Sequence, residues 1–333
     1  MTNLRVLFIG GTGTISAAAS ELAVQRGLQL TILNRGHTSL RPAPAGVKTL
    51  TADMRDGASV RKALGRRRFD VVVDFIAFTP EHVQRDIELF EGRTGQYVFI
   101  SSASAYQKPP ARLPITESTP LRNPYWQYSQ DKIACEELLV SAYRQRGFPI
   151  TIVRPSHTYD QTRVPLTGEW TALDRMRRGA PVVVHGDGTS LWTLTHSRDF
   201  AKGFVGLLGN PQAIGDSFHI TSDELLTWNQ ITELLAAAAG VKAEIVHVPS
   251  DALAAASPEL GAAHLGDRAH SVIFDNSKIK ALVPDFTATT PFAAGAREIV
   301  NWYFAHPEQQ VVDQELDALF DRLVVASRFT RKR

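Results

Sequence analysis

Residues 4–16 read LRVLFIGGTGTIS, and this stretch decides the fold. Residues 4–9 are mostly apolar, a pattern typical of a short buried strand, and they run directly into a glycine turn. A helical pattern over 17–26 follows the turn. A strand, a glycine turn and a helix in immediate succession indicate the start of a parallel α/β sheet that binds a dinucleotide. An ordinary glycine turn is the alternative interpretation.

The residues of this turn have separate predicted roles. Gly10 permits the tight turn, and Gly13 lets the backbone approach a pyrophosphate. Thr14 and Ile15 begin the helix, whose N-terminus attracts phosphate groups. The third glycine position of such a turn is Ser16 here, and its hydroxymethyl group predicts a helix displaced slightly outward from the strand.

The second predicted strand, 28–33, ends in Asn34 and Arg35. Proteins that select NAD usually carry an acidic residue at this point for the ribose hydroxyl. An amide and a guanidinium instead tolerate or pair with a 2′-phosphate, so the sequence favours NADP over NAD. Arg35 as a solvated loop residue is the alternative.

Tyr128 and Lys132 lie four residues apart at the start of a helical stretch, which places them on one helix face. A cation one turn away is expected to lower the pKa of the phenol, so that Tyr128 could act as an acid or base. The alternative is an amphipathic helix with a lysine that extends to solvent.

Together these segments resemble the extended short-chain dehydrogenase/reductase superfamily, in particular its NAD(P)-dependent epimerase/dehydratase branch. The resemblance covers most of the chain. Its marks, in chain order, are Gly10-x-x-Gly13, Asp53-Met54, the segment 71–77 ending at Ala77, the segment 97–106 with Ser102, Tyr128-x-x-x-Lys132, Val153-Arg154-Pro155, and Thr195 to Asp199.

The resemblance implies roles for individual residues. Tyr128 matches the catalytic acid/base, and Lys132 matches the lysine that holds the nicotinamide ribose. Ser102 matches the residue that hydrogen-bonds the reacting oxygen, with Ser101 and Ser104 as its nearest competitors.

Other matches concern the cofactor. Asp53 and Met54 match a loop that contacts adenine, and Ala77 matches a strand end beside the pyrophosphate. The alternatives are a turn or helix cap for Asp53 and simple helix packing over Ala77.

The 4,6-dehydratases of this branch place an Asp-Glu pair directly after the catalytic Ser or Thr. Ala103-Ser104 stands there, which disfavours dehydration and leaves epimerisation or carbonyl reduction by hydride transfer. A hypothesis of another class is a non-catalytic relative that binds a dinucleotide or RNA.

The residues expected to contact the substrate differ from those of the sugar-nucleotide epimerases. Trp192 stands where those enzymes tend to carry a diphosphate-binding arginine, and His157 stands where they tend to carry an asparagine. An indole carries no charge, so the case for a nucleotide sugar is weakened. The predicted substrate is a secondary alcohol or ketone of a sugar or nucleotide-sugar-like molecule, and an NADPH-dependent ketone or aldehyde reductase of a non-nucleotide substrate is the alternative. The predicted substrate residues are Ser104, His157, Trp192 and Arg268, of which Arg268 is placed most like the family's second substrate arginine.

The remaining charged residues and the composition restrict the ligands and the cellular location that the sequence predicts. Arg163 is another candidate cation, whereas Arg175, Arg177 and Arg178 are expected on a solvated helix face, and no His/Cys/carboxylate spacing predicts a metal site. The 333 residues have a formal charge of +2 and a pI near 8.7, and so small an excess of positive charge does not predict nucleic-acid binding.

The single cysteine, Cys135, is expected on the polar side of a helix. An unpaired thiol, no leader and no apolar run of about 18 residues lead us to expect a cytoplasmic protein without a membrane span.

Strand and helix patterns alternate to about residue 155, which predicts a doubly wound parallel sheet of the Rossmann type. The resemblance implies a dinucleotide-binding lobe from 1–155 plus about 191–221, interleaved with a smaller substrate lobe from about 156–190 plus 222–333. It also implies a homodimer through helices 80–91 and 128–146, and loop 107–124 is placed to cover a substrate. The expected strands are 4–9, 28–33, 47–51, 70–76, 96–101 and 150–153; the other expected helices are 169–178, 197–208, 227–239 and 289–304.

Overall fold

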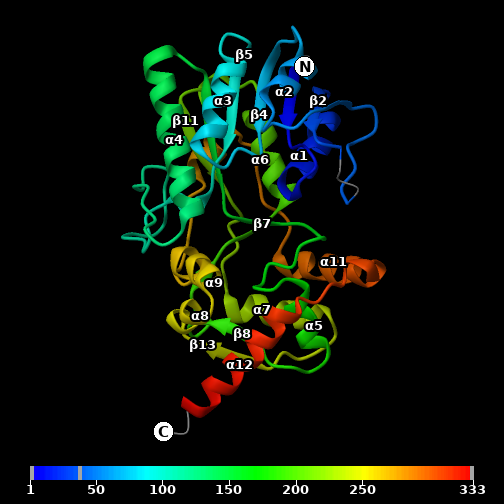
Figure 1. Ribbon diagram of the computed structural model, residues 1–333, viewed down its shortest axis with the longest axis vertical. Helices are drawn as coiled ribbons and strands as arrows, with labels where there is room; N and C mark the ends of the chain where they lie inside the picture. The colour runs from blue at the N-terminus through cyan, green and yellow to red at the C-terminus, as the bar shows by residue number, and fades with distance from the viewer. Residues whose placement is uncertain (1–3, 37–39, 331–333) are drawn as a thin grey trace.

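The computed structural model describes residues 4–36 and 40–330. The outer ends of the two expected lobes, 1–3 and 331–333, lie outside the described residues. A large parallel sheet with its helices forms the upper half of Figure 1, and a smaller, mainly helical part forms the lower half.

The sheet has seven strands in the order β11-β6-β5-β4-β1-β2-β3, and every neighbouring pair is parallel. The predicted doubly wound sheet is therefore confirmed. The six predicted strands differ from the observed ones by at most two residues at an end. The strands are β1 (Arg5–Ile9), β2 (Gln29–Asn34), β3 (Lys48–Thr51), β4 (Phe69–Asp74), β5 (Thr94–Ile100), β6 (Ile150–Pro155) and β11 (Asp216–Ile220).

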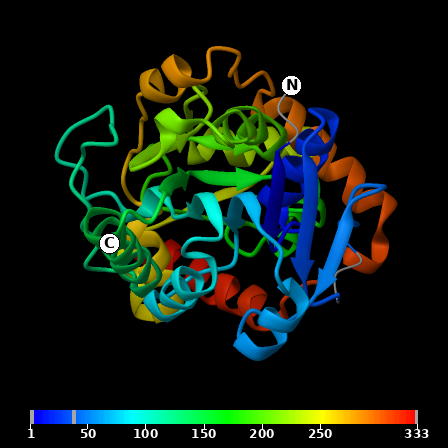
Figure 2. The same ribbon diagram turned by 90° about the horizontal axis from the view of Figure 1, so that it is seen from above.

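Helices cover both faces of this sheet (Figures 1 and 2). Alternate residues of the central strands pack on opposite sides, as Val6 and Phe8 pack with one helical layer while Leu7 and Ile9 pack with the other. Burial on both faces explains why these strands are continuously apolar in sequence. One layer has α1 (Thr14–Gln25) and α6 (Ser197–Leu207); the other has α2 (Gly57–Leu64), α3 (Pro80–Phe90) and α4 (Gln127–Arg146).

The expected position of Cys135 is wrong. Its side chain is fully buried in the layer between α4 and the sheet, beside Leu139. Burial raises the pKa of this thiol to about 12, so Cys135 behaves as a small apolar residue.

Short strand pairs connect and build the smaller part. The parallel pair β7 (His157–Tyr159) and β10 (Leu194–His196) lies at the waist in Figure 1, from which α6 and β11 return to the large sheet. The other strands are β8 (Val182–His185) with β13 (Ile245–Val248) and β9 (Leu191–Trp192) with β12 (Leu226–Thr227). The helices are α5 (Trp170–Arg177), α7 (Trp228–Ala238), α8 (Ser250–Ala256), α9 (Pro258–Ala263), α10 (Ser277–Leu282), α11 (Phe292–Ala305) and α12 (Gln314–Thr330), with single turns at Ala103–Ala105, Pro211–Ala213, His264–Arg268 and Pro307–Gln309.

Arg175 is another correction, because it does not lie on a solvated face. Its side chain is fully buried and forms ion pairs with Asp317 and Asp321 of α12. The sequence did not reveal α12 as a partner, since that helix approaches α5 from more than a hundred residues away. Arg175 therefore fastens the C-terminal helix to the smaller part.

Candidate functional site

Three adjoining cavities lie along the edge where the parallel strands end. The glycine-loop cavity, about 440 Å³, contains the turn after β1 and shares Ile76 and Phe78 with the second cavity. That second one, the Arg35 cavity, measures about 150 Å³. The third, the lobe cavity, measures about 270 Å³ and shares Ser102 and Tyr128 with the glycine-loop cavity. Because neighbouring cavities share lining residues, we refer to the three together as the cleft.

The glycine turn has no room for a side chain at its first position. Gly10 has a φ of +80°, and a Cβ there would lie 2.5 Å from Cγ2 of Ile76. The Ser16 side chain is buried, at 1% exposed. Its hydroxyl donates to the Gly10 carbonyl at 2.6 Å and accepts from the Gly13 N–H at 2.7 Å. Ser16 therefore holds the turn through its hydroxyl, and the outward displacement of the helix stays a prediction.

We expect Gly10→Ala to destabilise the protein by about 1–3 kcal/mol and to abolish dinucleotide binding, because it combines a strained φ with a steric clash against Ile76. Gly27→Ala is the matched control: Gly27 has a φ of +77°, and a Cβ at that position would meet nothing within 4 Å. Thermal unfolding and dinucleotide titration measure both effects. Equal losses in the two variants would mean that the space at Gly10 is unimportant.

The Arg35 cavity brings together predicted adenosine residues and Ala77, which was predicted beside the pyrophosphate. Arg35, Asp53, Met54 and Ala77 line it, whereas Asn34 does not, since its Oδ1 accepts from the Gly36 N–H at 3.0 Å. Asp53 also caps its own turn by accepting from the Arg55 N–H at 2.9 Å, as its alternative interpretation expected. Two further arginines that sequence reasoning missed line the same cavity, namely Arg55 and Arg85.

Lys132 lies at the floor of the glycine-loop cavity with 1% of its surface exposed. Its Nζ donates to the carbonyl oxygens of Ala77 and Ile100, each at 2.7 Å. The ammonium also lies 4.7 Å from the ring centre of Phe78. Burial lowers the pKa of Lys132 to about 8, so the group remains mostly charged at neutral pH.

Tyr128 lines both the glycine-loop cavity and the lobe cavity, beside Trp126 and Phe78. The prediction that Lys132 lowers its pKa is wrong for this structure. Burial raises the pKa of Tyr128 above its usual value, and the nearby Ser102 hydroxyl only partly opposes that rise. The ammonium of Lys132 lies 5.8 Å from the phenol ring centre and is directed at two carbonyls. Tyr128 is therefore protonated at neutral pH and can donate a proton.

The three serines at the end of β5 have different surroundings. Ser102 lines the cleft, and its hydroxyl lies 2.9 Å from that of Ser104. Ser104 is buried and accepts from the Ser129 hydroxyl at 2.8 Å. Ser101 also lines the glycine-loop cavity, but its hydroxyl is engaged by Glu136, to which it donates at 2.5 Å. Of the three, Ser102 is the one whose hydroxyl lies nearest Tyr128 in the cleft.

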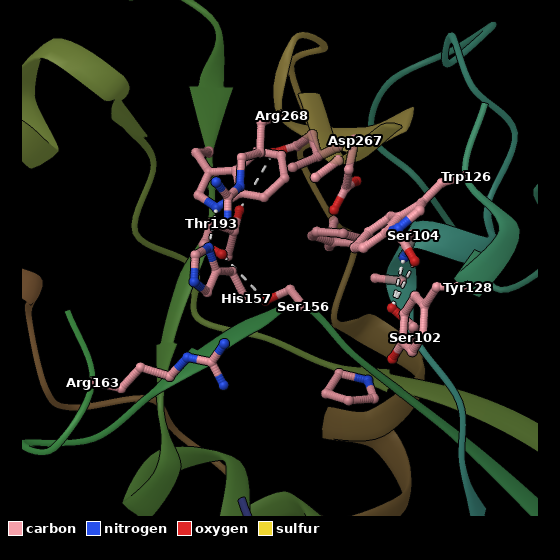
Figure 3. Close-up of a pocket in the computed structure, with 16 residues that line it drawn as sticks. Ser102, Ser104, Trp126, Tyr128, Ser156, His157, Arg163, Thr193, Asp267 and Arg268 are labelled. Atoms are coloured by element: carbon pink, nitrogen blue, oxygen red, sulfur yellow. Dashed lines mark hydrogen bonds between the residues drawn. The ribbon is translucent and has the colours of Figure 1, made fainter. Parts of the chain in front are cut away.

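The lobe cavity collects the four predicted substrate residues, as Figure 3 shows for Ser104, His157 and Arg268. The fourth, Trp192, has its indole N–H directed at Nδ1 of His157 at 3.2 Å. Burial, followed by the charges of Arg268 and Arg163, holds the pKa of His157 well below its usual range. A neutral ring that accepts at Nδ1 carries its proton on Nε2, so His157 can donate to a ligand.

Arg268 is the cation without a carboxylate partner in this cavity. Within residues 4–36 and 40–330 it has no ion pair, and its Nη1 donates to the Thr167 hydroxyl at 2.7 Å. The neighbouring Asp267 is paired with the buried Lys108 at 2.7 Å, and Arg163 lies 3.4 Å from a carboxylate oxygen of Glu169. The cavity therefore carries one uncompensated positive charge.

Sequence reasoning missed several residues of the lobe cavity. Trp126 lies two residues before Tyr128 and Asp267 lies beside Arg268, so both could have been found by extending the motifs to their neighbours. Thr193 and Phe274 also line the cavity, but no local pattern marks them.

Loop 107–124 lies beside the lobe cavity but contributes none of the residues that line it. Asn123 donates from Nδ2 to the carbonyls of Ser104 and Gly266, at 2.9 and 2.6 Å. The Ile115 N–H donates to the Ile273 carbonyl at 2.6 Å. These contacts join the loop to the segment that carries Arg268, and its role of covering a substrate stays a prediction.

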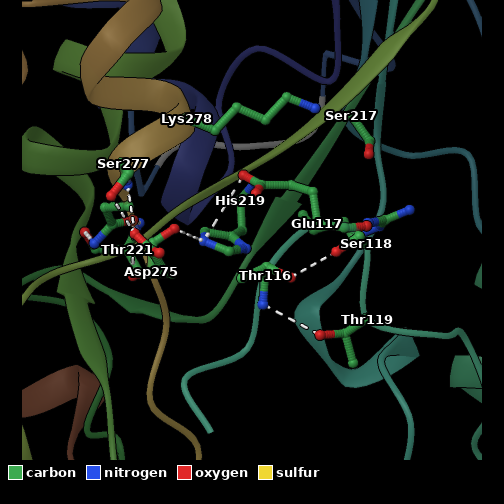
Figure 4. Close-up of polar contacts among 12 residues, drawn as sticks. Thr116, Glu117, Ser118, Thr119, Ser217, His219, Thr221, Asp275, Ser277 and Lys278 are labelled. Carbon is green, nitrogen blue, oxygen red and sulfur yellow. Dashed lines mark hydrogen bonds and ion pairs between the residues drawn. The ribbon is translucent and has the colours of Figure 1, made fainter. Parts of the chain in front are cut away.

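A buried polar network lies behind the cleft. Arg154 donates to both carboxylate oxygens of Glu136, at 2.9 and 2.5 Å, and to the Tyr106 hydroxyl at 3.1 Å. That hydroxyl lies 3.1 Å from Nδ1 of His219, whose Nε2 donates to the Asp275 carbonyl at 2.8 Å (Figure 4). Both ring nitrogens of His219 are occupied, so this histidine is structural and not a base for nearby hydroxyl groups.

Two kinds of site are not found among the described residues. No group of three or more His, Cys, Asp or Glu side chains is placed to hold a metal ion in 4–36 and 40–330. Over the same residues, no helix has the length and apolar character needed to cross a membrane.

Comparisons with known proteins agree with this geometry. A family model described as the NAD dependent epimerase/dehydratase family matches residues 6–221. A chloroplast stem-loop binding protein of 41 kDa from Arabidopsis thaliana is 28% identical over 73% of this chain, and the match spans 65% of that protein. The 2′-dehydrokanamycin reductase of Streptomyces kanamyceticus is 26% identical over 74% of this chain and 70% of the reductase.

A solved structure shows the same fold. The UDP-glucose 4-epimerase of Bifidobacterium longum, in complex with NAD⁺ and UDP, superposes with a TM-score of 0.73 at 18% identity, over 91% of this chain and 99% of the epimerase. Because the family model covers well over half of the sequence, the chain belongs to the NAD dependent epimerase/dehydratase family.

Proposed function

We propose that the protein is an NADP(H)-dependent oxidoreductase that reduces a ketone, or oxidises the matching secondary alcohol, of a sugar-like substrate that carries no nucleotide. In this proposal Tyr128 is the acid/base, Ser102 hydrogen-bonds the reacting oxygen, and Lys132 holds the nicotinamide ribose. The cofactor is held by the lobe formed from 1–155 plus about 191–221, and the substrate by 156–190 plus 222–333.

The cleft residues fit a nicotinamide dinucleotide. The turn at Gly10 has no room for a Cβ, and the first N–H groups of α1 have no partners within their helix, so both suit a pyrophosphate. When bound, the nicotinamide supplies or accepts the hydride. The proposed cofactor contacts are Gly10, Gly13, Thr14, Ile15, Arg35, Asp53, Met54, Ala77, Tyr128 and Lys132.

The observation that carries the proposal is the position of Tyr128 and Ser102 on the shared wall of two cavities. A hydroxyl there can reach a substrate oxygen in the lobe cavity while the adjacent cavity holds the nicotinamide. The raised pKa of Tyr128 supports the reductive direction, because the protonated phenol is the form that delivers a proton to a nascent alkoxide.

The residues that line the lobe cavity suit a compact, polar substrate. Trp192 is 3% exposed and its N–H is already engaged by His157, so it offers no contact to a diphosphate. Arg268 leaves a single uncompensated charge, which suits a substrate with at most one anionic group. The name of the Streptomyces relative, 2′-dehydrokanamycin reductase, also supports a reductase.

An epimerase is the second candidate, and the UDP-glucose 4-epimerase of Lactobacillus helveticus supports it with 30% identity over 45% of this chain. A non-catalytic RNA-binding protein is less well supported, because Ser102, Tyr128 and Lys132 line one cavity. The Arabidopsis relative, whose name says that it binds a stem-loop, is the observation that favours it.

Two measurements separate the candidates. A reductase should consume NADPH in proportion to an added keto-sugar and should release no nucleotide when denatured after purification. Retained NAD, with sugar inversion and no net cofactor consumption, would establish the epimerase instead. Absence of both activities across a keto-sugar panel, with dinucleotide binding intact, would contradict both enzymatic versions.

The cofactor preference gives a separate prediction. Arg35→Asp should weaken NADPH binding roughly 10- to 100-fold and leave NADH binding nearly unchanged, because a charge-assisted contact contributes about 1.5–3 kcal/mol. Arg144→Asp is the matched control, since Arg144 is an exposed arginine of α4 with no partner among the described residues. Fluorescence titration with both cofactors measures the change. An unaltered preference would show that Arg35 is a solvated loop residue.

A further inference from the structure

A second large hollow lies at the opposite edge of the sheet from the cleft. It measures about 700 Å³ and is bounded by the amino ends of four neighbouring strands, β4, β1, β2 and β3. In Figure 1 this edge is far from the smaller part of the molecule. We call it the amino-edge hollow; its charged lining residues are Arg5, Lys48, Arg66, Arg67 and Arg68.

The charged residues that line this hollow are all cationic. Its lining includes five cations and no Asp or Glu within the described part of the chain. Only Arg5 is neutralised, by Asp70 at 2.9 Å. A formal charge of +2 for the whole chain thus conceals a local excess, because the acidic residues lie elsewhere.

The four other cations remain available to a ligand. Lys48 and Arg66 have no hydrogen-bond or ion-pair partner among residues 4–36 and 40–330, and both are exposed. Arg67 donates from Nη1 to the carbonyls of Ala63 and Leu64, and Arg68 donates to the Gly92 carbonyl at 2.9 Å. A carbonyl partner leaves the positive charge uncompensated, and each guanidinium keeps further N–H donors free.

We propose that the amino-edge hollow binds the phosphate backbone of a nucleic acid. Four uncompensated cations spread along one concave surface match a chain of regularly spaced phosphates better than a single small anion, for which donors must converge on one point. The aromatic residue that lines the hollow, Phe69, is only 7% exposed, and none of the large exposed apolar side chains among the described residues lines it, so no aromatic ring is presented there for base stacking. Recognition is therefore of the backbone, without base specificity.

This site is separate from the proposed oxidoreductase site. The cleft lies at the carboxyl ends of the same strands, so a bound strand would not cover Tyr128 or the lobe cavity. Binding through the hollow does not depend on whether the proposed reaction is correct.

The test is a fluorescence-anisotropy titration of the full chain with a labelled single-stranded RNA and the DNA strand of the same sequence. Four phosphate contacts predict a slope of log K against log salt of about −3 for a single strand. Lys48→Ala/Arg66→Ala should reduce that slope to about −1.5 and weaken binding at low salt roughly tenfold or more. These two side chains have no partner among the described residues, so the variant should keep the wild-type unfolding midpoint.

Lys242→Ala/Arg297→Ala is the matched control, since it removes two exposed, unpartnered cations of the described chain away from the hollow. It should bind like the wild type. A preference for RNA over DNA would identify the backbone sugar as a contact, and equal binding would assign the interaction to phosphate alone; both outcomes support the proposal. No binding of either strand at low salt, binding only to anionic vesicles, or equal losses in the two double variants would overturn it.

Discussion

Replacing Tyr128 by phenylalanine should reduce turnover about 10²- to 10⁴-fold, the usual contribution of a positioned general acid. The phenol is the protonated group on the wall shared by the glycine-loop and lobe cavities, and its pKa is raised by burial. Phenylalanine keeps the ring that packs beside Trp126 and Phe78, so the fold and the cofactor affinity should change little. Initial rates of NADPH oxidation and cofactor titration measure the two effects separately.

Tyr125→Phe serves as the control for this substitution. Tyr125 lies three residues earlier, is 45% exposed, and its hydroxyl has no partner in the described part of the chain. It should retain wild-type rates. If Tyr128→Phe kept full activity with every productive substrate, the proton would come from elsewhere and the proposed mechanism would be wrong.

The strands and the residues at their ends were predictable because they depend on local pattern and on one rule of parallel sheets. Gly10, Ala77 and Ser102 each follow a strand that the sequence marks by an apolar run. In a parallel sheet all such ends meet at one edge, so a cleft there follows without any tertiary information. This is why Gly10 and Ser102, from distant segments, line the same glycine-loop cavity.

Side-chain environments were less predictable, because they depend on which element packs against which. The helix 127–146 has almost no apolar asymmetry in sequence, and Cys135 proved to be buried instead of on a polar side. The pKa of Tyr128 was expected to fall next to Lys132, yet burial raises it, and burial is set by Phe78 and Trp126 from outside the motif. Arg85 lies in the Arg35 cavity only because α3 packs beside the loop after β3.

The structure of the smaller part was harder still to predict, since its strands are too short to produce a recognisable alternation of apolar and polar residues. The pairs β7–β10 and β9–β12 have only two or three residues per strand, and partners come from distant segments. Arg268 was located by resemblance, whereas its lack of a carboxylate partner among the described residues could be known only after Asp267 was seen to pair with Lys108.

The largest effect on stability should come from Arg154. Arg154→Met should destabilise the fold by about 3–5 kcal/mol, because it leaves the Glu136 carboxylate buried without its partner. Both side chains are nearly inaccessible, at 5% and 2% exposed, and the pair is bidentate. Urea unfolding of the wild type and the variant measures the difference. Arg146→Met is the matched control, since its pair with Glu91 is 3.5 Å long and exposed, and it should cost less than about 1 kcal/mol.

The double variant Arg154→Met/Glu136→Leu distinguishes an unpaired charge from lost packing. If the cost of Arg154→Met arises from the stranded carboxylate, removing Glu136 as well should recover most of the lost stability, since two apolar side chains of similar size need no partner. If the double variant is as unstable as the single one, the role of Arg154 lies instead in its bond to the Tyr106 hydroxyl. Because Glu136 also accepts from Ser101, the residue directly before Ser102, the recovered fold should still show slower turnover than the wild type. The double variant would then recover stability without recovering turnover. Stability requires only that neither buried charge lacks its partner, whereas turnover requires the Glu136 carboxylate to hold the end of β5 in place.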